Sequence, residues 1–553
     1  MLYKKIICVI LIVLVIILVG GCKMGTEKKN NDMSKFAVSD SERADINALA
    51  EELKGLRCEY STGKKTMPED IDITIQKKQK ISTIKWNGYI CFEEGGDTKL
   101  LLETNSSYNL TFGTGIHFQS KITPDQTVSV KPDIYYDFNI DYTFSGQDSD
   151  TIKFVCDLPY HFTISKPMPG GEFPPVEPVM DIGMRDCMVM TGPDGNYYMT
   201  GTNGPDFWND NDGIHIYKST DLKEWTDLGM VWDIEKDGTW ANRRDQDNRR
   251  PIWAPELHYI ESQKNYFLTY SMGFNDGMCS GILKSTTGNV EGPYVDIKTD
   301  GPMFDSIDTT LFEDDDGSVY VTYGNGSIAK MKSDMSGIEG DFKKLTAADG
   351  GPIGFEGYYI VKHNGLYYVT AADSDWIVTG NSSDPYANSY DALWACSDNI
   401  YGPYSERRML LQNAGHNNVF FDNDGNTWTT MFISNGYHVP FLTKPAIERL
   451  YFDDNGFLKV DRQKTETIDV DENNKFTLDN IPDGEFYITV KSSIKADVFV
   501  NGVKAFTAET ADYNRPFMIS QEAHDALIVG ENEITCPKSA KAVFGIEIWK
   551  IVE

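Results

Sequence analysis

The sequence is short of positive charge. Its 553 residues include 51 Lys and Arg against 83 Asp and Glu, which gives a net charge of −32. Such a charge repels phosphate backbones and anionic lipid headgroups. The composition therefore argues against nucleic acid as a partner, and against membrane attachment through the protein surface.

Cysteine is also scarce, and its spacing shows no pairing. Removing Cys8 and Cys22 from the nine cysteines leaves seven, with no C-x-x-C pair among them. An odd number without such a pair indicates neither a disulfide framework nor a zinc site. We expect small buried or free thiols at Cys58, Cys91, Cys156, Cys187, Cys279, Cys396 and Cys536.

Long apolar runs are missing except at the start, where Ile6 to Val19 follows two lysines and precedes Gly20-Gly21-Cys22. A run of about 14 residues is short for a membrane span. The pattern predicts a signal peptide over residues 1–22, and its end resembles a bacterial lipobox in which Cys22 takes the lipid. A plain signal peptide or a membrane anchor is the alternative. We expect a protein at the cell surface, lipid-anchored to a bacterial membrane, with no other membrane contact.

The remaining chain divides by composition into a tether and three larger units. A Pro- and Gly-rich stretch over residues 166–178 favours a linker. Alternating β-formers precede and follow the central region, and a "VNG" hairpin signal lies at 500–502. The predicted units are a flexible tether (23–41), an N-terminal β-rich domain (42–166) that begins with a helix, a central domain (179–461) and a C-terminal β-sandwich (465–553).

One short pattern, a turn followed by an aromatic-rich strand, recurs five times in the central domain. The turn positions are separated by 70, 52, 48 and 60 residues, near the period of about 40 to 50 residues in propeller blades. We therefore predict an all-β protein whose centre is a five-bladed β-propeller, flanked by the two β domains. The turns are at Gly195, Asn265, Gly317, Gly365 and Gly425.

An ionisable residue lies nine positions before each of these turns. If the repeats are blades, this position falls at an equivalent point of each innermost strand, and such points converge near the propeller axis. Crowded carboxylates raise the pKa of at least one member, the electrostatic setting for glycoside hydrolysis. The five residues are Asp186, Glu256, Asp308, Glu356 and His416.

Five motifs around these residues resemble, in order, the blade motifs of glycoside hydrolase family 43: "MRDC", "WAPELHYI", "SIDTTLFEDDDG", "FEGYYIVKHNGLYYV" and "GHNNVFFDNDGN". The resemblance implies a five-bladed propeller acting by inversion on β-xylosides, α-L-arabinofuranosides or related galactosides. It implies Asp186 as the general base, Glu356 as the general acid, and Asp308 as the residue that raises the pKa of Glu356 and orients it. Cys187 is a departure, because the family usually has Pro there.

The resemblance leaves two roles open for His416: a ligand, through water, of a structural calcium ion, or a histidine that tunes the carboxylates. No cofactor is required for the chemistry. Glu256 and Trp253 are expected to contact the sugar substrate, as is His416. The other tryptophans that could supply a flat face for a sugar are Trp208, Trp240 and Trp376, although core positions are commoner for each.

Three functions are compatible with the sequence. The first is a glycosidase of the β-xylosidase or α-L-arabinofuranosidase type, and the second is a galactan-active glycosidase of the same family. The third is a surface glycan-binding lipoprotein without catalysis, for which we would expect the carboxylate set to be broken. All three acids are present, so catalysis is preferred. The C-terminal sandwich could bind carbohydrate or pack on the propeller, and the oligomeric state is open.

Overall fold

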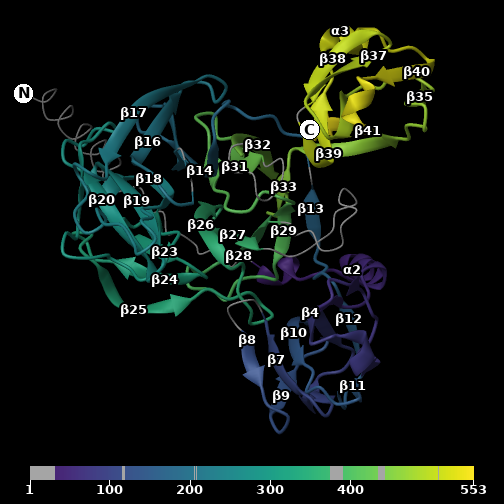
Figure 1. The fold of residues 1–553 in the computed structure, drawn as a ribbon. Coiled ribbons are helices and arrows are strands. Elements are labelled where there is room, and N and C mark those ends of the chain that lie inside the picture. The colour runs from purple at the N-terminus through teal and green to yellow at the C-terminus, as the bar shows by residue number, and fades with distance from the viewer. Residues whose placement is uncertain are drawn as a thin grey trace, which may run out of the picture.

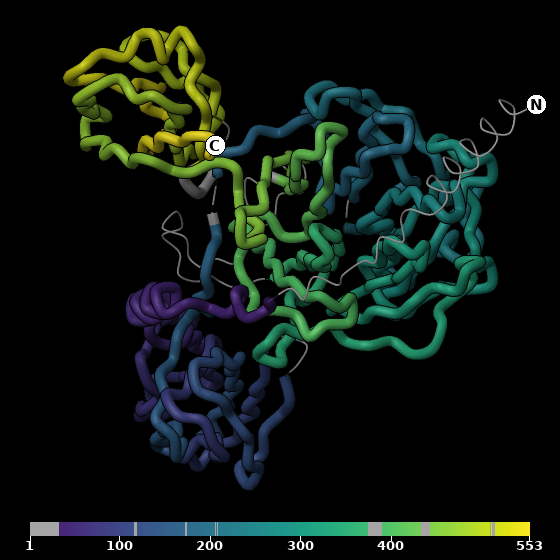
Figure 2. The backbone as a smooth tube through the Cα atoms, turned by 180° about the vertical axis from the view of Figure 1, so that it is seen from behind, coloured from purple at the N-terminus to yellow at the C-terminus, as the bar shows by residue number. Residues whose placement is uncertain are grey.

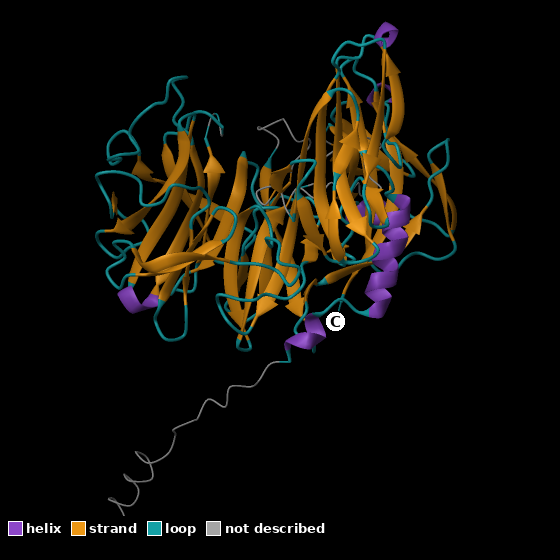
Figure 3. Ribbon diagram, turned by 90° about the horizontal axis from the view of Figure 1, so that it is seen from below, coloured by secondary structure: helices purple, strands orange, loops and turns teal. Residues whose placement is uncertain are grey.

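A computed structural model describes residues 32–114, 119–172, 174–204, 206, 208–373, 390–433, 443–508 and 510–552. Within these ranges strands dominate and helices are few and short (Figure 3), and no helix is long and apolar enough to cross a membrane. The helices are η1 (Met33–Phe36), α2 (Asp40–Glu52), η2 (Lys77–Gln79), η3 (Glu261–Gln263), α3 (Gln521–Asp525) and η5 (Lys538–Ala540).

The centre of the molecule is a five-bladed β-propeller, and the N-terminal and C-terminal sheets both lie on one side of it (Figures 1 and 2). Each blade is an antiparallel sheet of four strands in chain order. Blade 1 contains β14 (Met184–Thr191), β15 (Tyr197–Asn203), β16 (Gly213–Ser219) and β17 (Trp225–Asp233). Blade 2 contains β18 (Ile252–Ile260), β19 (Asn265–Phe274), β20 (Gly277–Ser285) and β21 (Tyr294–Asp296).

The other three blades repeat this plan. Blade 3 contains β22 (Thr310–Glu313), β23 (Val319–Tyr323), β24 (Ser327–Met331) and β25 (Ile338–Lys344). Blade 4 contains β26 (Glu356–His363), β27 (Leu366–Asp373), β28 (Asp391–Ser397) and β29 (Arg408–Leu411). Blade 5 contains β30 (Val419–Phe421), β31 (Thr427–Ile433), β32 (Lys444–Phe452) and β33 (Leu458–Val460).

The propeller core lies between neighbouring blades. Both faces of each sheet carry apolar side chains, so no blade could bury its own surface alone. Five separate clusters fill the five interfaces, and two of them are built around Trp232 and Tyr270 (blades 1 and 2) and around Trp394 and Leu450 (blades 4 and 5). Stacking the sheets radially is therefore what the sequence pattern requires.

The ring closes between blade 5 and blade 1 through side chains. The Asn418 amide accepts a hydrogen bond from the Val189 N–H and donates one to the Val189 carbonyl, each 2.9 Å long. The Thr430 hydroxyl donates to the Cys187 carbonyl at 2.6 Å. Cys187 itself is buried in this interface, in agreement with a packing role. All seven cysteines of the described chain are free thiols.

The N-terminal domain contains a large sheet, a small sheet and a two-stranded pair. The large sheet has the order β2-β1-β4-β10-β7-β8, with β12 also paired to β4. In β10 buried and exposed side chains alternate, as the sequence of β-formers predicts. The strands are β1 (Arg57–Tyr60), β2 (Lys65–Thr66), β3 (Asp72–Gln76), β4 (Thr83–Phe92), β5 (Gly96–Lys99), β6 (Leu101–Glu103), β7 (Ser107–Gly113), β8 (Gln119–Ile122), β9 (Thr127–Val130), β10 (Tyr135–Thr143), β11 (Ser149–Val155) and β12 (Tyr160–Thr163).

Two segments expected to be irregular have structure. In the predicted tether, η1 places Phe36, which is fully buried, edge-on to Trp394 at 6.4 Å and beside Phe457 at 5.1 Å. The expectation of a flexible chain up to residue 41 is therefore wrong from Met33 onward, because burial of one aromatic ring fixes the segment. In the predicted linker, β13 (Gly170–Glu172) pairs in parallel with β29 and adds a fifth strand to blade 4.

The C-terminal sheets form a β-sandwich around one apolar cluster. The first sheet has the order β34 (Arg462–Ile468), β41 (Val543–Ile551), β36 (Glu485–Ser492) and β39 (Ala511–Met518). The second has the order β35 (Lys475–Leu478), β40 (Gly530–Thr535), β37 (Ala496–Val500) and β38 (Val503–Ala508). Arg462 joins this domain to the propeller, because it contacts both Glu448 and Glu485.

Candidate active site

The innermost strands of all five blades share one irregularity near their start. One residue at or just before the start of each strand has a left-handed backbone, with φ between 44° and 61°. Two residues later, each strand pairs with a threonine of the second strand. The left-handed residues are Asp186, Ala254, Asp308, Gly357 and His416. Four of the five are not glycine, and such strain is found mainly at functional sites.

The structure corrects the predicted equivalence of the five ionisable residues. Asp186, Asp308 and His416 do occupy the same left-handed position. Glu356 is the residue before that position in blade 4, and Glu256 is two residues after it in blade 2. The nine-residue offset fails in blade 4 because its first hairpin is one residue shorter than that of blade 1. In blade 2 the first hairpin is one residue longer, and Asn265 also lies one residue beyond Lys264, the left-handed turn residue that corresponds to Gly195.

Asp186 lies in a setting that favours its charged form. Its carboxylate contacts Arg185 Nε at 3.1 Å and accepts a hydrogen bond from the Thr202 hydroxyl at 2.7 Å, and His416 Nδ1 is 3.5 Å away. Burial alone would raise the pKa of Asp186, but these cationic and hydroxyl partners hold it below its ordinary value. Thr202 is fixed in turn by the N–H of Ala254 at 2.7 Å.

Glu356 lies in the opposite setting. Burial, with the negative charge of Asp186, raises its pKa, although His416, Arg185 and a hydrogen bond from Tyr390 oppose the shift. The Tyr390 hydroxyl donates to Oε1 of Glu356 at 2.8 Å. Gly415 makes room for this tyrosine, since a Cβ there would lie 2.6 Å from its ring. Two carboxyl groups within a single ring of residues thus have pKa values shifted in opposite directions.

Asp308 is held between blades 2, 3 and 4. Its N–H donates to Ser271 Oγ at 2.8 Å, and its Oδ2 accepts from the N–H of Gly357 at 3.2 Å. Burial and repulsion by Glu356 and Asp186 raise its pKa to about 7, while His416 opposes them. The charge on Glu356 is one of these causes, so ionisation of one carboxyl group disfavours ionisation of the other.

Comparison with known proteins agrees with this geometry. The family model of glycosyl hydrolases family 43 matches residues 176–458, which span the whole propeller. The chain belongs to this family.

Curated relatives of the family 43 domain carry several substrate names. β-D-Galactofuranosidase xynD of Aspergillus niger is 29% identical over 272 residues, which are 43% of this chain and 72% of that protein. Arabinoxylan arabinofuranohydrolase of Paenibacillus polymyxa is 25% identical over 274 residues, and the match spans only 40% of its length. A solved family 43 structure, CoXyl43 from a compost metagenome, is a β-xylosidase/α-arabinofuranosidase; it is 21% identical, with a TM-score of 0.42, and the match covers 53% of this chain and 98% of that one.

His416 connects the carboxylates of this family 43 site. Its Nδ1 is 3.5 Å from Asp186 and 3.9 Å from Asp308, and these charges raise its pKa although burial opposes them. Its Nε2 is buried and has no hydrogen-bond partner in the described chain. Calcium takes six to eight oxygen ligands, and no three His, Cys, Asp or Glu side chains of the described residues come together to hold an ion. These side chains alone do not fit calcium, and no step below depends on it.

Glu256 and Trp253 lie on β18 but in different surroundings. Glu256 is buried with Oε2 at 3.1 Å from His258 Nε2, further along the strand than the left-handed residues. Trp253 packs edge-on to Trp208 at 6.1 Å, and its ring covers Gly273 so closely that any Cβ there would overlap it. Trp208 is 41% exposed. Trp240 stacks on Tyr270 beside the core between blades 1 and 2, and Trp376 lies outside the described residues.

Two residues that contact the family 43 carboxylates, Arg185 and Tyr390, were not predicted from the sequence. Arg185 stands beside Asp186 in the "MRDC" motif, so its position in the chain was a usable signal. Tyr390 precedes β28 and gives no such signal. Its hydroxyl reaches Glu356 within blade 4, where Gly415 leaves room for the ring.

Proposed function

We propose that the protein is an inverting glycoside hydrolase of the α-L-arabinofuranosidase and β-xylosidase type. The observation that carries the proposal is the pair Asp186 and Glu356, whose surroundings shift their pKa values in opposite directions. Such a pair provides an ionised base and a protonated acid at the same pH. A glycan-binding protein without catalysis would not need two carboxyl groups whose pKa values are shifted in opposite directions.

In the proposed reaction Asp186 takes a proton from water, and the resulting hydroxide adds to the anomeric carbon. Glu356 gives its proton to the glycosidic oxygen as the bond from that oxygen to the anomeric carbon breaks. Tyr390 orients Glu356 through its hydrogen bond. Inversion requires the two carboxyl groups to be about 6.5 to 9.5 Å apart, so that the water fits between Asp186 and the sugar.

Asp308 is assigned as the residue that keeps Glu356 protonated, by the repulsion between the two carboxyl groups. His416 holds Asp186 and Asp308 in their places as the charged partner of both. Trp253, and with it Trp208, would form the apolar face against which a sugar stacks. Glu256 is assigned a supporting role through His258 rather than direct contact with the substrate.

The relatives favour a furanoside as substrate. Their names include arabinofuranohydrolase and β-D-galactofuranosidase, and α-L-arabinofuranose and β-D-galactofuranose have the same ring configuration and differ in the group outside the ring. A galactofuranoside, or another galactose-containing glycan, is therefore the second candidate substrate.

A panel of aryl glycosides tests the proposal. We expect release of 4-nitrophenol from 4-nitrophenyl α-L-arabinofuranoside or β-D-xyloside by the wild type, and loss of that release in Glu356→Gln with sugar binding retained. A Glu356→Gln variant as active as the wild type would refute the acid assignment. Activity on the β-D-galactofuranoside alone would favour the second candidate.

The proposed location is the cell surface, with a lipid on Cys22. Residues 1–31 lie outside the described part of the chain, so the proposal rests on the sequence pattern. Metabolic labelling with a fatty acid should tag the wild type and leave Cys22→Ala unlabelled. Labelling of both, or of neither, would contradict the assignment.

A further inference from the structure

Arg185 contacts one of the two proposed catalytic carboxyl groups and lies near the other. Its Nε is 3.1 Å from Oδ1 of Asp186. On another side, its guanidinium carbon is 5.9 Å from the centre of the Tyr390 ring, and the hydroxyl of this tyrosine holds Glu356. A sugar bound between Asp186 and Glu356 would therefore lie against this guanidinium.

Aromatic rings from two further segments hold the guanidinium of Arg185. Its central carbon is 4.4 Å from the ring centre of Trp208 and 4.9 Å from that of Phe432. Trp208 belongs to the connection between β15 and β16, and Phe432 to β31 of blade 5. A guanidinium stacked on aromatic rings keeps its N–H groups in the guanidinium plane, free to bond outward.

Most of the hydrogen-bonding capacity of Arg185 is unused. A guanidinium carries five N–H donors, and within the described chain only Nε has an acceptor. The side chain is 18% exposed, so its terminal nitrogens lack the full hydration of a surface arginine. A partly buried fork of donors beside a catalytic base is suited to two adjacent oxygen atoms of a ligand.

We propose that Arg185 is a substrate-binding residue whose terminal N–H groups donate to two neighbouring hydroxyl groups of the sugar held between Asp186 and Glu356. This inference rests on the proposed function. The ligand is a neutral sugar rather than a uronic acid, because the carboxylate of Asp186, whose pKa is lowered, would repel a further carboxylate. Trp208 is the second residue of this proposed binding site, because its ring covers the guanidinium of Arg185 and fixes the orientation of the guanidinium plane.

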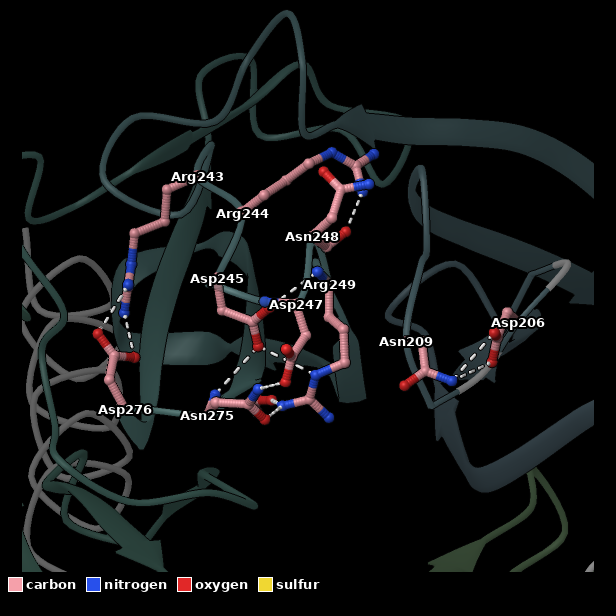
Figure 4. Close-up of polar contacts among 11 residues, drawn as sticks. Asp206, Asn209, Arg243, Arg244, Asp245, Asp247, Asn248, Arg249, Asn275 and Asp276 are labelled. Atoms are coloured by element: carbon pink, nitrogen blue, oxygen red, sulfur yellow. Dashed lines mark hydrogen bonds and ion pairs between the residues drawn. The ribbon is translucent and has the colours of Figure 1, made fainter.

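The loop that carries Trp208 is held by hydrogen bonds, and Figure 4 shows those between Asp206 and Asn209. Asp206 accepts hydrogen bonds from the Trp208 N–H at 3.2 Å and from the Asn209 side chain at 3.0 and 3.1 Å. The Arg250 N–H donates to the Asn209 carbonyl at 2.7 Å, and Arg244 pairs with Asp210 at 3.1 Å. The Trp208 loop is thus tied to the neighbouring loop over residues 241–250.

That neighbouring loop is itself anchored to blade 2. The buried carboxylate of Asp245 accepts the N–H groups of Asp247, Arg249 and Asn275 at 3.0, 2.8 and 3.1 Å, and Arg249 Nε at 3.0 Å. Arg243 pairs with both oxygens of Asp276. The loop over residues 241–250 contains four arginines, each paired with an acidic side chain: Arg243, Arg244, Arg249 and Arg250. This loop therefore positions Trp208 and presents no unpaired arginine.

Three variants test the proposal on 4-nitrophenyl α-L-arabinofuranoside, β-D-xyloside and β-D-galactofuranoside. We expect Arg185→Gln to raise KM by about 10-fold or more, because charged donors to the sugar are lost. Arg185→Lys keeps the charge but loses the planar fork, so its KM should lie between those of Arg185→Gln and the wild type. Trp208→Ala should raise KM by a smaller factor. Arg449→Gln is the matched control, because Arg449 also pairs with a carboxylate, Asp461 at 3.0 Å, on the outer part of blade 5.

Direct binding separates failure of the inference from failure of the proposed function. Calorimetry with L-arabinose, D-xylose and D-galactose should show weaker binding to the Glu356→Gln/Arg185→Gln double variant than to Glu356→Gln alone. An active wild type with KM unchanged within twofold in both Arg185 variants overturns the inference only. If Arg185→Gln does not fold, the KM of Arg185→Lys decides between the same two outcomes. A wild type that neither hydrolyses the three glycosides nor binds the three sugars overturns both.

Discussion

The hydroxyl of Tyr390 donates a hydrogen bond of 2.8 Å to Oε1 of Glu356, and it comes from the segment that precedes the third strand of the same blade. This bond stabilises the charged form of Glu356 and lowers its pKa. Tyr390→Phe should therefore raise the pKa of Glu356 further. The alkaline limb of kcat/KM should move to higher pH, with a loss of rate of about 10-fold for one hydrogen bond to a charged group. An alkaline limb that stays in place would show that Glu356 does not titrate there.

Replacing Asp308 should move the alkaline limb of kcat/KM to lower pH. Asp308→Asn removes a carboxyl group that repels the charge on Glu356, so the pKa of Glu356 falls. Glu356 must be protonated to act, and activity should then be lost at lower pH, by about one pH unit. The pH dependence of kcat/KM for Tyr390→Phe and Asp308→Asn, measured together with that of the wild type, checks the direction in which each variant shifts the alkaline limb.

The acid limb of the pH profile should belong to Asp186. The base must be deprotonated, and the lowered pKa of Asp186 places its limb at acidic pH, below that of Glu356, whose pKa is raised. We expect a broad plateau between the two limbs in kcat/KM. Asp186→Asn should lower kcat by at least about 100-fold at every pH, since no base replaces the carboxylate.

The stereochemistry of the product distinguishes inversion from retention. Proton NMR of a fresh reaction mixture should show the anomer of opposite configuration to the substrate before mutarotation. First appearance of the anomer with the substrate's configuration would mean that Asp186 attacks carbon directly. The two carboxyl groups would then have to be about 5 to 5.5 Å apart.

Phe36 should matter for stability although it lies outside the propeller repeats. Its ring is fully buried against Trp394 and Phe457. We expect Phe36→Ala to lower the free energy of unfolding by about 3 to 5 kcal/mol, measured by denaturant titration. Glu52→Ala, at an exposed position of α2, should change it by less than about 0.5 kcal/mol. Equal effects would mean that η1 is not part of the folded unit.

The sequence allowed the propeller and its three carboxylates to be predicted, because each blade repeats a turn and an aromatic-rich strand. It could not give the register of the inner strands. The turn has two residues after His363 and four after Ile260, against five in blade 1, and the strands beside these shorter turns pair further. Both differences shift the count in blades 4 and 2, and only the pairing with the second strand reveals this. Glu356 and Glu256 therefore looked equivalent to Asp186 when they are not.

Contacts made by the connections between strands could not be predicted, for a different reason. Tyr390 and Trp208 belong to connections between strands, where no repeat fixes position, and both reach the site through packing with other segments. The burial of Phe36 could not be predicted either, because it lies in a polar stretch and a single buried ring produces no apolar periodicity in the sequence around it. Arg185 could have been found, because it adjoins Asp186 in the chain.

The junction between the first and last blades has a mechanical consequence. In the described chain the two blades share no strand, and the amide of Asn418 holds Val189 by both of its polar atoms. Asp186 stands on one side of this junction, and His416 and Glu356 on the other. If the propeller ring opened between blades 1 and 5, Asp186 would separate from His416 before any blade unfolded. On heating, activity should therefore be lost when blades 1 and 5 separate, at a lower temperature than the unfolding of the sheets.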